Sequence, residues 1–140
     1  MTITPEQLAA SGTESGQQKA LFAWAAQLAK YNPAMKLHML HAIPNGGKRD
    51  PLTAARLKAE GARAGVPDVC FPVPWHDFAG LYIELKIEGG RVSPEQRTWL
   101  ADLRSVGYAV AVAWSFEAAK QAILDYMAGT LGDDLREYRK

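Results

Sequence analysis

An apolar run near the end of the chain, Tyr108 to Trp114, constrains the fold more than any other feature. Alanine and valine alternate along it, and it contains no charged side chain to face water. Such a run is typical of a strand that is buried on both faces. A helix that opens with a capping box is predicted before it, from Ser93 to Ser105, and Ser115 caps a second helix that continues to Met127. The sequence therefore predicts a sheet packed against helices.

The remaining segments predict the same α/β class, with a mixed sheet flanked by α-helices. The further elements, in chain order, are a short helix from Thr4 to Ser11, a helix from Thr13 to Lys30, a strand from Leu37 to Ile43, a helix from Pro51 to Arg63, and strands from Val66 to Val73 and from Leu81 to Glu88. The charged segment after Gly132 is expected to fray. A chain of 140 residues is large enough to bury the core of one domain.

Charge, cysteine content and hydropathy exclude several classes of protein. A net charge of +1 does not by itself indicate a protein that grips long duplex DNA through charge. The single cysteine, Cys70, cannot form an intramolecular disulfide or a cysteine-rich zinc site, which favours a reducing compartment. The N-terminus lacks the basic and apolar regions of a signal peptide, and no apolar run is long enough to span a bilayer. We therefore expect a soluble, cytoplasmic protein.

The predicted strand from Leu81 to Glu88 carries an unusual pair of charges. Because side chains alternate along a strand, Glu84 and Lys86 share one face, and apolar side chains occupy the other. Two interpretations are open. The pair can belong to the solvated face of an edge strand, or it can form a metal-and-lysine site that faces a cleft.

Asp68 adds a second carboxylate at the start of the preceding predicted strand. Aspartate is depleted in strands, so Asp68 is either a turn residue after Pro67 or a functional side chain. If the two strands are neighbours, the carboxylates of Asp68 and Glu84 meet. Carboxylates that close repel each other unless a cation lies between them, and oxygen ligands favour Mg²⁺ or Mn²⁺ over zinc.

The helix from Thr13 to Lys30 also directs polar groups inward. Its apolar stripe, spaced i, i+3, i+4 and i+7, consists of Leu21, Trp24, Ala25 and Leu28. Counting back from Leu21 places Glu14 and Gln18 on the same face. A carboxylate on a buried face needs a partner, so Glu14 is a further candidate for the site.

The most basic stretch of the chain lies between residues 48 and 63. It lies beside the turn Asn45-Gly46-Gly47, whose backbone N–H groups can form a nest for a phosphate. The cations that follow are Lys48, Arg49, Arg56, Lys58 and Arg63, against the two acids Asp50 and Glu60. The stretch is either a solvated helix face next to a turn or a surface that contacts a nucleic-acid backbone.

Several segments in the same order resemble the VRR-NUC (virus-type replication-repair nuclease) domain, a branch of the PD-(D/E)XK nuclease superfamily. The segments are Glu14 to Phe22, Ala42 to Arg49, Leu57 to Gly61, Gly65-Val66-Pro67-Asp68, Tyr82-Ile83-Glu84-Leu85-Lys86, Gly90 to Gln96, and Gly107-Tyr108 with the strand and helix after it. The resemblance implies a nuclease domain over residues 14–128, preceded by an extension or short helix at 1–13 and followed by a charged tail at 129–140.

The resemblance also implies roles for individual residues. Asp68 and Glu84 would ligate Mg²⁺ or Mn²⁺, with the backbone carbonyl of Leu85 as a further ligand. Glu14 would complete the metal site, directly or through water. Lys86 would orient the attacking water and offset negative charge that develops at phosphorus.

Gln96 has two possible roles. It resembles the family's glutamine after the core motif, which would steady water or Lys86. It is also the N3 residue of the capping box that Ser93 opens. We expect that one rotamer cannot fill both roles, and the sequence favours neither.

Together these features predict a Mg²⁺- or Mn²⁺-dependent DNA endonuclease. At the family level, the resemblance implies structure-specific action on branched DNA such as four-way (Holliday) junctions in DNA repair. One compact chain with one site must form a C2 homodimer to cut two strands symmetrically. The alternatives are a catalytically inactive nucleic-acid-binding module and a non-nuclease metal protein of the same fold.

Overall fold

The computed structural model describes residues 3–44, 50–132 and 135–139. In these ranges the strands form one five-stranded sheet in the order β1-β2-β3-β4-β5. Their bounds are β1 His41–Ala42, β2 Val69–Phe71, β3 Leu81–Leu85, β4 Ala109–Ala113 and β5 Arg136–Tyr138. The β1–β2 and β2–β3 pairs are antiparallel, whereas β3–β4 and β4–β5 are parallel. The prediction of a mixed sheet in an α/β fold is confirmed.

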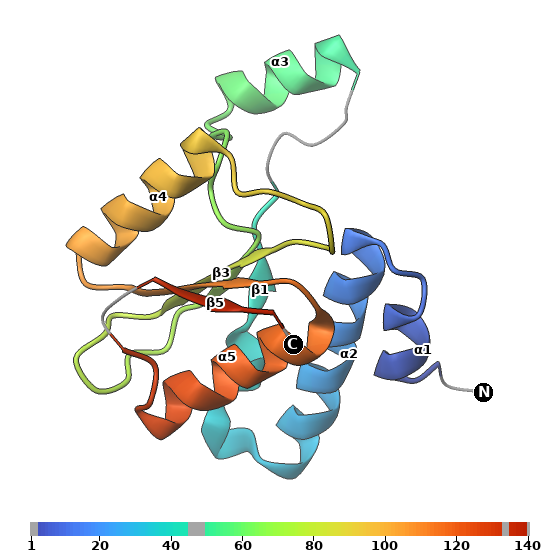
Figure 1. Cartoon of the computed structure of the whole chain (residues 1–140), viewed down its shortest axis with the longest axis vertical. Helices are drawn as coiled ribbons and strands as arrows, with labels where there is room; N and C mark the ends of the chain where they lie inside the picture. Colours follow the sequence, from blue (N-terminus) through green and yellow to red (C-terminus); the bar gives the residue numbers. More distant parts are fainter. Residues whose placement is uncertain (1–2, 45–49, 133–134, 140) are drawn as a thin grey trace.

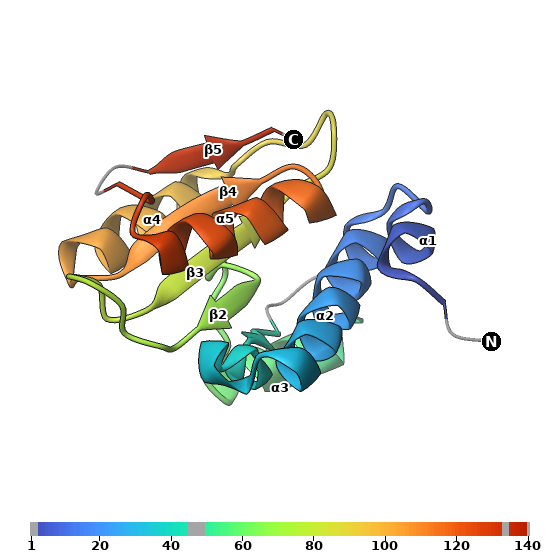
Figure 2. The same ribbon diagram turned by 90° about the horizontal axis from the view of Figure 1, so that it is seen from below.

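Helices cover both faces of this sheet. They are α1 Pro5–Ala9, α2 Glu14–Tyr31, α3 Pro51–Ala59, α4 Pro94–Ser105 and α5 Phe116–Ala128, with two 3₁₀ turns, η1 Pro33–Met35 and η2 Leu37–Met39. Figures 1 and 2 show α2 and α5 on one side of the sheet and α4 on the other. Within the described ranges, no helix combines the length and apolar character needed to cross a membrane.

The apolar run that predicts the architecture is β4, and it is buried on both faces as expected. Ala109, Ala111 and Ala113 lie in the core with α2 and α5, whereas Val110 and Val112 pack with α4. Small side chains on the first face let α5 approach the sheet closely, through alanines of its own. The alternation of size along β4 therefore matches the two helical layers.

The stripe predicted on α2 is also confirmed. Leu21 and Ala25 are buried, and Trp24 and Leu28 pack partly against the core. Sequence analysis missed the role of Gln17, whose Nε2 donates to the Ala9 carbonyl at 2.8 Å and whose Oε1 accepts from the Phe116 N–H at 2.6 Å. This side chain therefore ties α2 both to α1 and to the start of α5.

The strand predicted from Leu37 to Ile43 is wrong over most of its length. Residues Leu37–Met39 form a 3₁₀ turn, and only His41–Ala42 pair with β2. Leu37 and Leu40 are both buried, a spacing of three that suits a 3₁₀ turn and not the alternation of a strand. Lys36, immediately before this 3₁₀ turn, has a left-handed backbone conformation with φ of 58° and changes the direction of the chain.

The expectation that the charged C-terminal segment frays is wrong for its described residues 135–139. Arg136–Tyr138 form β5, parallel to β4, and the Trp114 N–H donates to the Tyr138 carbonyl at 2.9 Å. The Tyr138 hydroxyl donates to Asp125 Oδ2 at 2.7 Å, and the Arg139 guanidinium lies 3.6 Å from the centre of a Trp114 ring. Contacts with distant residues therefore hold a segment whose local composition favours disorder.

Helix α3 differs from the other long helices. None of its residues is buried, and Leu52 is 84% exposed. Figure 1 shows α3 at the top of the view, standing away from the sheet. Along the chain it lies between β1 and β2. Its stability comes from local features: Asp50 caps it through the Thr53 N–H at 2.9 Å, and Pro51 occupies its first turn.

Candidate active site

The antiparallel pairing of β2 with β3 brings the two carboxylates of the motif together. Val69 pairs with Ile83, so the residue before Val69 stands opposite the residue after Ile83, and these are Asp68 and Glu84. Both side chains point to the face of the sheet that α4 covers, since their neighbours Val69 and Ile83 belong to the opposite core. The two strands are neighbours, so the condition under which the Asp68 and Glu84 carboxylates meet is fulfilled.

Asp68 is held in place by the backbone of the neighbouring strand. Its Oδ2 accepts a hydrogen bond from the Leu85 N–H at 2.8 Å. In a strand, the N–H and C=O of one residue point to the same side, so the Leu85 carbonyl also points toward β2. The register places Pro67 opposite Leu85. Because proline has no N–H, Pro67 cannot donate the hydrogen bond that the Leu85 carbonyl would usually accept in an antiparallel pair.

Glu84 lies at the centre of the site and is only 2% exposed. Its Oε2 accepts from Gln96 Nε2 at 2.9 Å and lies 3.6 Å from Lys86 Nζ. Its Oε1 is buried and has no hydrogen-bond partner among the described residues. A buried carboxylate oxygen without a partner is costly, so this atom marks a position that a ligand can satisfy.

Electrostatics agree with this geometry. Burial, followed by the nearby Asp68 charge, raises the pKa of Glu84 to about 9, and Lys86 acts in the opposite direction. Without a cation, Glu84 therefore holds a proton at neutral pH. A divalent ion between the carboxylates would favour the ionised form of Glu84 and so oppose the shift that burial and Asp68 cause.

Lys86 follows β3 directly and is 8% exposed. Its backbone N–H donates to the Ala113 carbonyl at 2.8 Å, which continues the parallel pairing with β4 past the end of the strand. Gly90 packs beside its side chain: a Cβ at Gly90 would lie 3.6 Å from Lys86 Cδ. The ammonium is thus confined close to Glu84.

Glu14 lies at the first position of α2, next to the cap that Thr13 forms with the Gly16 N–H at 2.9 Å. Glu14 is exposed, which corrects the expectation that its carboxylate lies on a buried face. Partial burial and the Asp68 charge nevertheless raise its pKa, and Lys86 lowers it, so Glu14 lies within electrostatic reach of the site. Gln18, predicted on the same face, is half-buried on α2.

Gln96 completes the capping box and also contacts the site, whereas its contact with water or Lys86 stays a prediction. Its Oε1 accepts from the Ser93 N–H at 2.8 Å, which completes the capping box, and its Nε2 donates to Glu84 Oε2 at 2.9 Å. One rotamer fills both positions because the two ends of the amide are used separately. The start of α4 and the central carboxylate are therefore linked by a single side chain.

Of the nucleic-acid contacts predicted in the basic stretch, the structure describes those on α3. Asn45, Gly46, Gly47, Lys48 and Arg49 lie outside the described residues. Arg56 and Lys58 are exposed on α3, and Arg56 pairs with Glu60 at 3.7 Å. The side chains that meet around Glu84 are those of Asp68, Lys86 and Gln96, with Glu14 at the rim.

The donor set fits a hard divalent cation. Among the described residues, no group of three or more histidine, cysteine, aspartate and glutamate side chains is placed to hold a metal ion. Two carboxylates remain, Asp68 and Glu84, with the Leu85 carbonyl beside them. Mg²⁺ is commonly held by one or two carboxylates and keeps several waters, so this smaller set and the unpartnered Glu84 oxygen suit it.

Comparisons with known proteins agree with the motif and the fold. Residues 5–117 match the family model of the VRR-NUC domain. A solved structure described as a "VRR_NUC domain protein" superimposes with a TM-score of 0.65 and 21% sequence identity, covering 89% of this chain and 92% of the other. The search of curated proteins gave no match. Because the family model covers most of the chain, this protein belongs to the VRR-NUC family of nuclease-type domains.

Proposed function

We propose that this protein is a Mg²⁺- or Mn²⁺-dependent DNA endonuclease. The observation that carries the proposal is the buried Glu84, with one oxygen unpartnered and Asp68 opposite it on the next strand. A structural carboxylate in this position would be satisfied by protein donors. Family membership supports the nuclease class.

In this proposal, Asp68, Glu84 and the Leu85 carbonyl would hold the cation, and Glu14 would complete the site through water, since among the described residues no third acidic side chain is placed to ligate it. Such a cation supplies an acidic water and polarises the phosphate. Gln96 keeps Glu84 Oε2 occupied, which leaves Oε1 for the metal. Lys86, 3.6 Å from the same Oε2, offsets the charge that develops on the phosphate oxygens and orients the nucleophile.

The remaining parts of the proposal concern the domain, the substrate, the location and the oligomeric state. We propose residues 14–128 as the nuclease domain, branched DNA such as four-way junctions as the substrate, and the cytoplasm as the location. Asn45, Gly46, Gly47, Lys48, Arg49, Arg56 and Lys58 are proposed contacts to the DNA backbone. Cutting two strands symmetrically requires a second copy of the site, so the active form is proposed to be a C2 homodimer.

The test uses supercoiled plasmid and a labelled four-way junction, incubated with Mg²⁺, Mn²⁺ or EDTA. Cleavage should require the metal and should fall by about 10²–10³-fold in Lys86→Ala, the size typical of removing one group that stabilises developing charge. Asp68→Asn should abolish cleavage. Gel filtration with light scattering measures the oligomeric state.

Two outcomes would contradict parts of the proposal. If the wild-type protein binds the junction but cuts neither substrate with either metal, it is a binding module and not an enzyme. If plasmid is cut and the junction is not, the nuclease stands and the branched substrate does not.

A further inference from the structure

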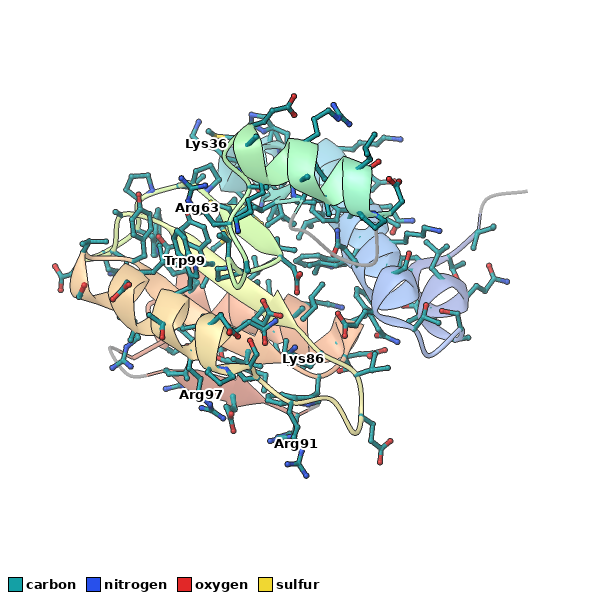
Figure 3. All side chains as sticks on the ribbon, turned by 90° about the horizontal axis from the view of Figure 1, so that it is seen from above. Lys36, Arg63, Lys86, Arg91, Arg97 and Trp99 are labelled. Atoms are coloured by element: carbon teal, nitrogen blue, oxygen red, sulfur yellow. The ribbon has the colours of Figure 1, made fainter. Side chains whose placement is uncertain are left out.

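Three arginines lie on segments that border the site, and one of them, Arg63, belongs to the basic stretch that sequence analysis named as a possible nucleic-acid contact. They are Arg63 in the segment before β2, Arg91 in the loop between β3 and α4, and Arg97 on α4. In the view of Figure 3, Lys86 lies between Arg63 above and Arg91 below, and Arg97 lies on the α4 side. All three are exposed.

Arg97 is adjacent in sequence to the residue that contacts the central carboxylate. Gln96 donates to Glu84 at 2.9 Å, so the backbone of Arg97 lies within one residue of the site. The capping box holds this first turn of α4 firmly, through the Ser93 hydroxyl as well as Gln96. The Arg97 side chain therefore extends into solvent from a fixed base.

Arg91 lies on a loop that is held on both sides. Its neighbour Gly90 packs beside the Lys86 side chain and accepts a hydrogen bond from Trp114 Nε1 at 3.4 Å. Its other neighbour, Val92, is 8% exposed and packs beneath α4. The loop is thus anchored to the core, and Arg91 is left at the surface next to Lys86.

Arg63 approaches from the opposite side of the site. Two residues later, Gly65 lies against the start of α4: a Cβ on Gly65 would be 2.7 Å from the Glu95 carbonyl carbon, and its φ is 89°. Such a close approach is open only to glycine. The segment that carries Arg63 is therefore wedged against the turn that carries Gln96.

The charge of these arginines is not used within the described part of the chain. Arg56, Arg136 and Arg139 form ion pairs with acidic side chains, whereas none is found for Arg63, Arg91 or Arg97 among the described residues. Exposed carboxylates on the same segments, Glu88 and Glu95, reduce the field but leave the guanidinium donors free. A planar guanidinium suits bidentate contact with a phosphate.

We infer that Arg63, Arg91 and Arg97 bind backbone phosphates of a nucleic-acid strand, on either side of the phosphate that lies at Asp68 and Glu84. The strand then crosses the end of β3 between α4 and the segment before β2. The inference rests on the proposed function for its choice of ligand. It adds an interaction surface that does not depend on α3.

Binding of a labelled DNA junction in Ca²⁺ or EDTA, followed by fluorescence anisotropy across a salt series, tests the inference without cleavage. A plot of log Kobs against log salt has a negative slope, and each phosphate contact contributes about 0.9 to its magnitude. The double variant Arg91→Gln/Arg97→Gln should therefore reduce this magnitude by about 2. Arg63→Gln alone should lower it by about 1. Arg97→Lys keeps the charge and should keep most of the slope.

The matched control removes two charges from the other face of the sheet, in Lys30→Gln/Lys120→Gln on α2 and α5, and should leave the slope unchanged. Equal unfolding midpoints would show that each variant is folded. If the wild type cuts DNA and the arginine variants bind with an unchanged slope, the inference is wrong and the nuclease stands. If the slope falls as expected and nothing is cut, the surface stands and the nuclease proposal is wrong.

Discussion

The two faces of β3 are buried to nearly the same extent but carry opposite chemistry. Toward α2 and α5, Leu81, Ile83 and Leu85 are at most 1% exposed. Toward α4, Glu84 is 2% exposed and Lys86 8%. Burying an aliphatic side chain stabilises a fold by about 1.5–3 kcal/mol, whereas a buried carboxylate opposes folding unless it is protonated or paired. One face of the strand therefore stabilises the domain, and the other buries a carboxyl group whose surroundings disfavour its charge.

The largest effect should come from Glu84→Gln. This change keeps the shape of the side chain and removes the charge that a metal requires, so cleavage should fall below detection. The apo protein should be no less stable than the wild type, because the amide need not be ionised. Endpoint cleavage and urea unfolding in EDTA measure the two quantities. A clear loss of apo stability would mean that Glu84 supports the fold.

The matched change on the opposite face is Ile83→Ala. Removing this buried side chain should cost about 2–5 kcal/mol of unfolding free energy, since it leaves a cavity between the sheet and α2. Cleavage per folded molecule should change little at a temperature where the variant stays folded. Urea unfolding and active-site titration separate the two effects. A large loss of activity in fully folded protein would contradict the division between the faces.

Gln96→Ala tests the link between α4 and the site. It removes the hydrogen bond to Glu84 Oε2 together with half of the capping box. Metal affinity should fall by about 10–100-fold, the range found when a group that orients a ligand is lost. Ser93→Ala is the control: it weakens the cap by about 1 kcal/mol and should leave metal affinity nearly unchanged. Isothermal titration with Mn²⁺ measures both variants.

A further prediction concerns the pH dependence of stability without metal. Because the pKa of Glu84 is raised from 4.5 to about 9, the native state holds a proton that the unfolded state has lost between these values. Stability should therefore decrease as pH rises from about 5 to 9, and Glu84→Gln should remove this part of the dependence. Urea midpoints at pH 5, 7 and 9 in EDTA measure it. A wild-type stability that rises across this range would contradict the pKa shift.

Much of the architecture could be predicted because its signals are local. The capping boxes at Thr4 and Ser93, the stripe on α2 and the apolar run of β4 each depend on neighbours within a few residues. The pairing of Asp68 with Glu84 could also be predicted, since both lie on adjoining segments of recognisable strand and belong to a shared motif. In these places the local preference of the chain agrees with its global fold.

What only the tertiary structure decided depends on partners far along the chain. The charged segment Arg136–Tyr138 becomes a strand because β4 offers it a free edge, and Gln17 acts as a link because Phe116 lies beside it. Gln96 fills two roles because α4 lies over β3. The sequence by itself determined the α/β class and the residues proposed to carry the chemistry. The burial of Glu84 and Lys86 and the unpartnered oxygen of Glu84 arise from long-range packing, which no local pattern encodes.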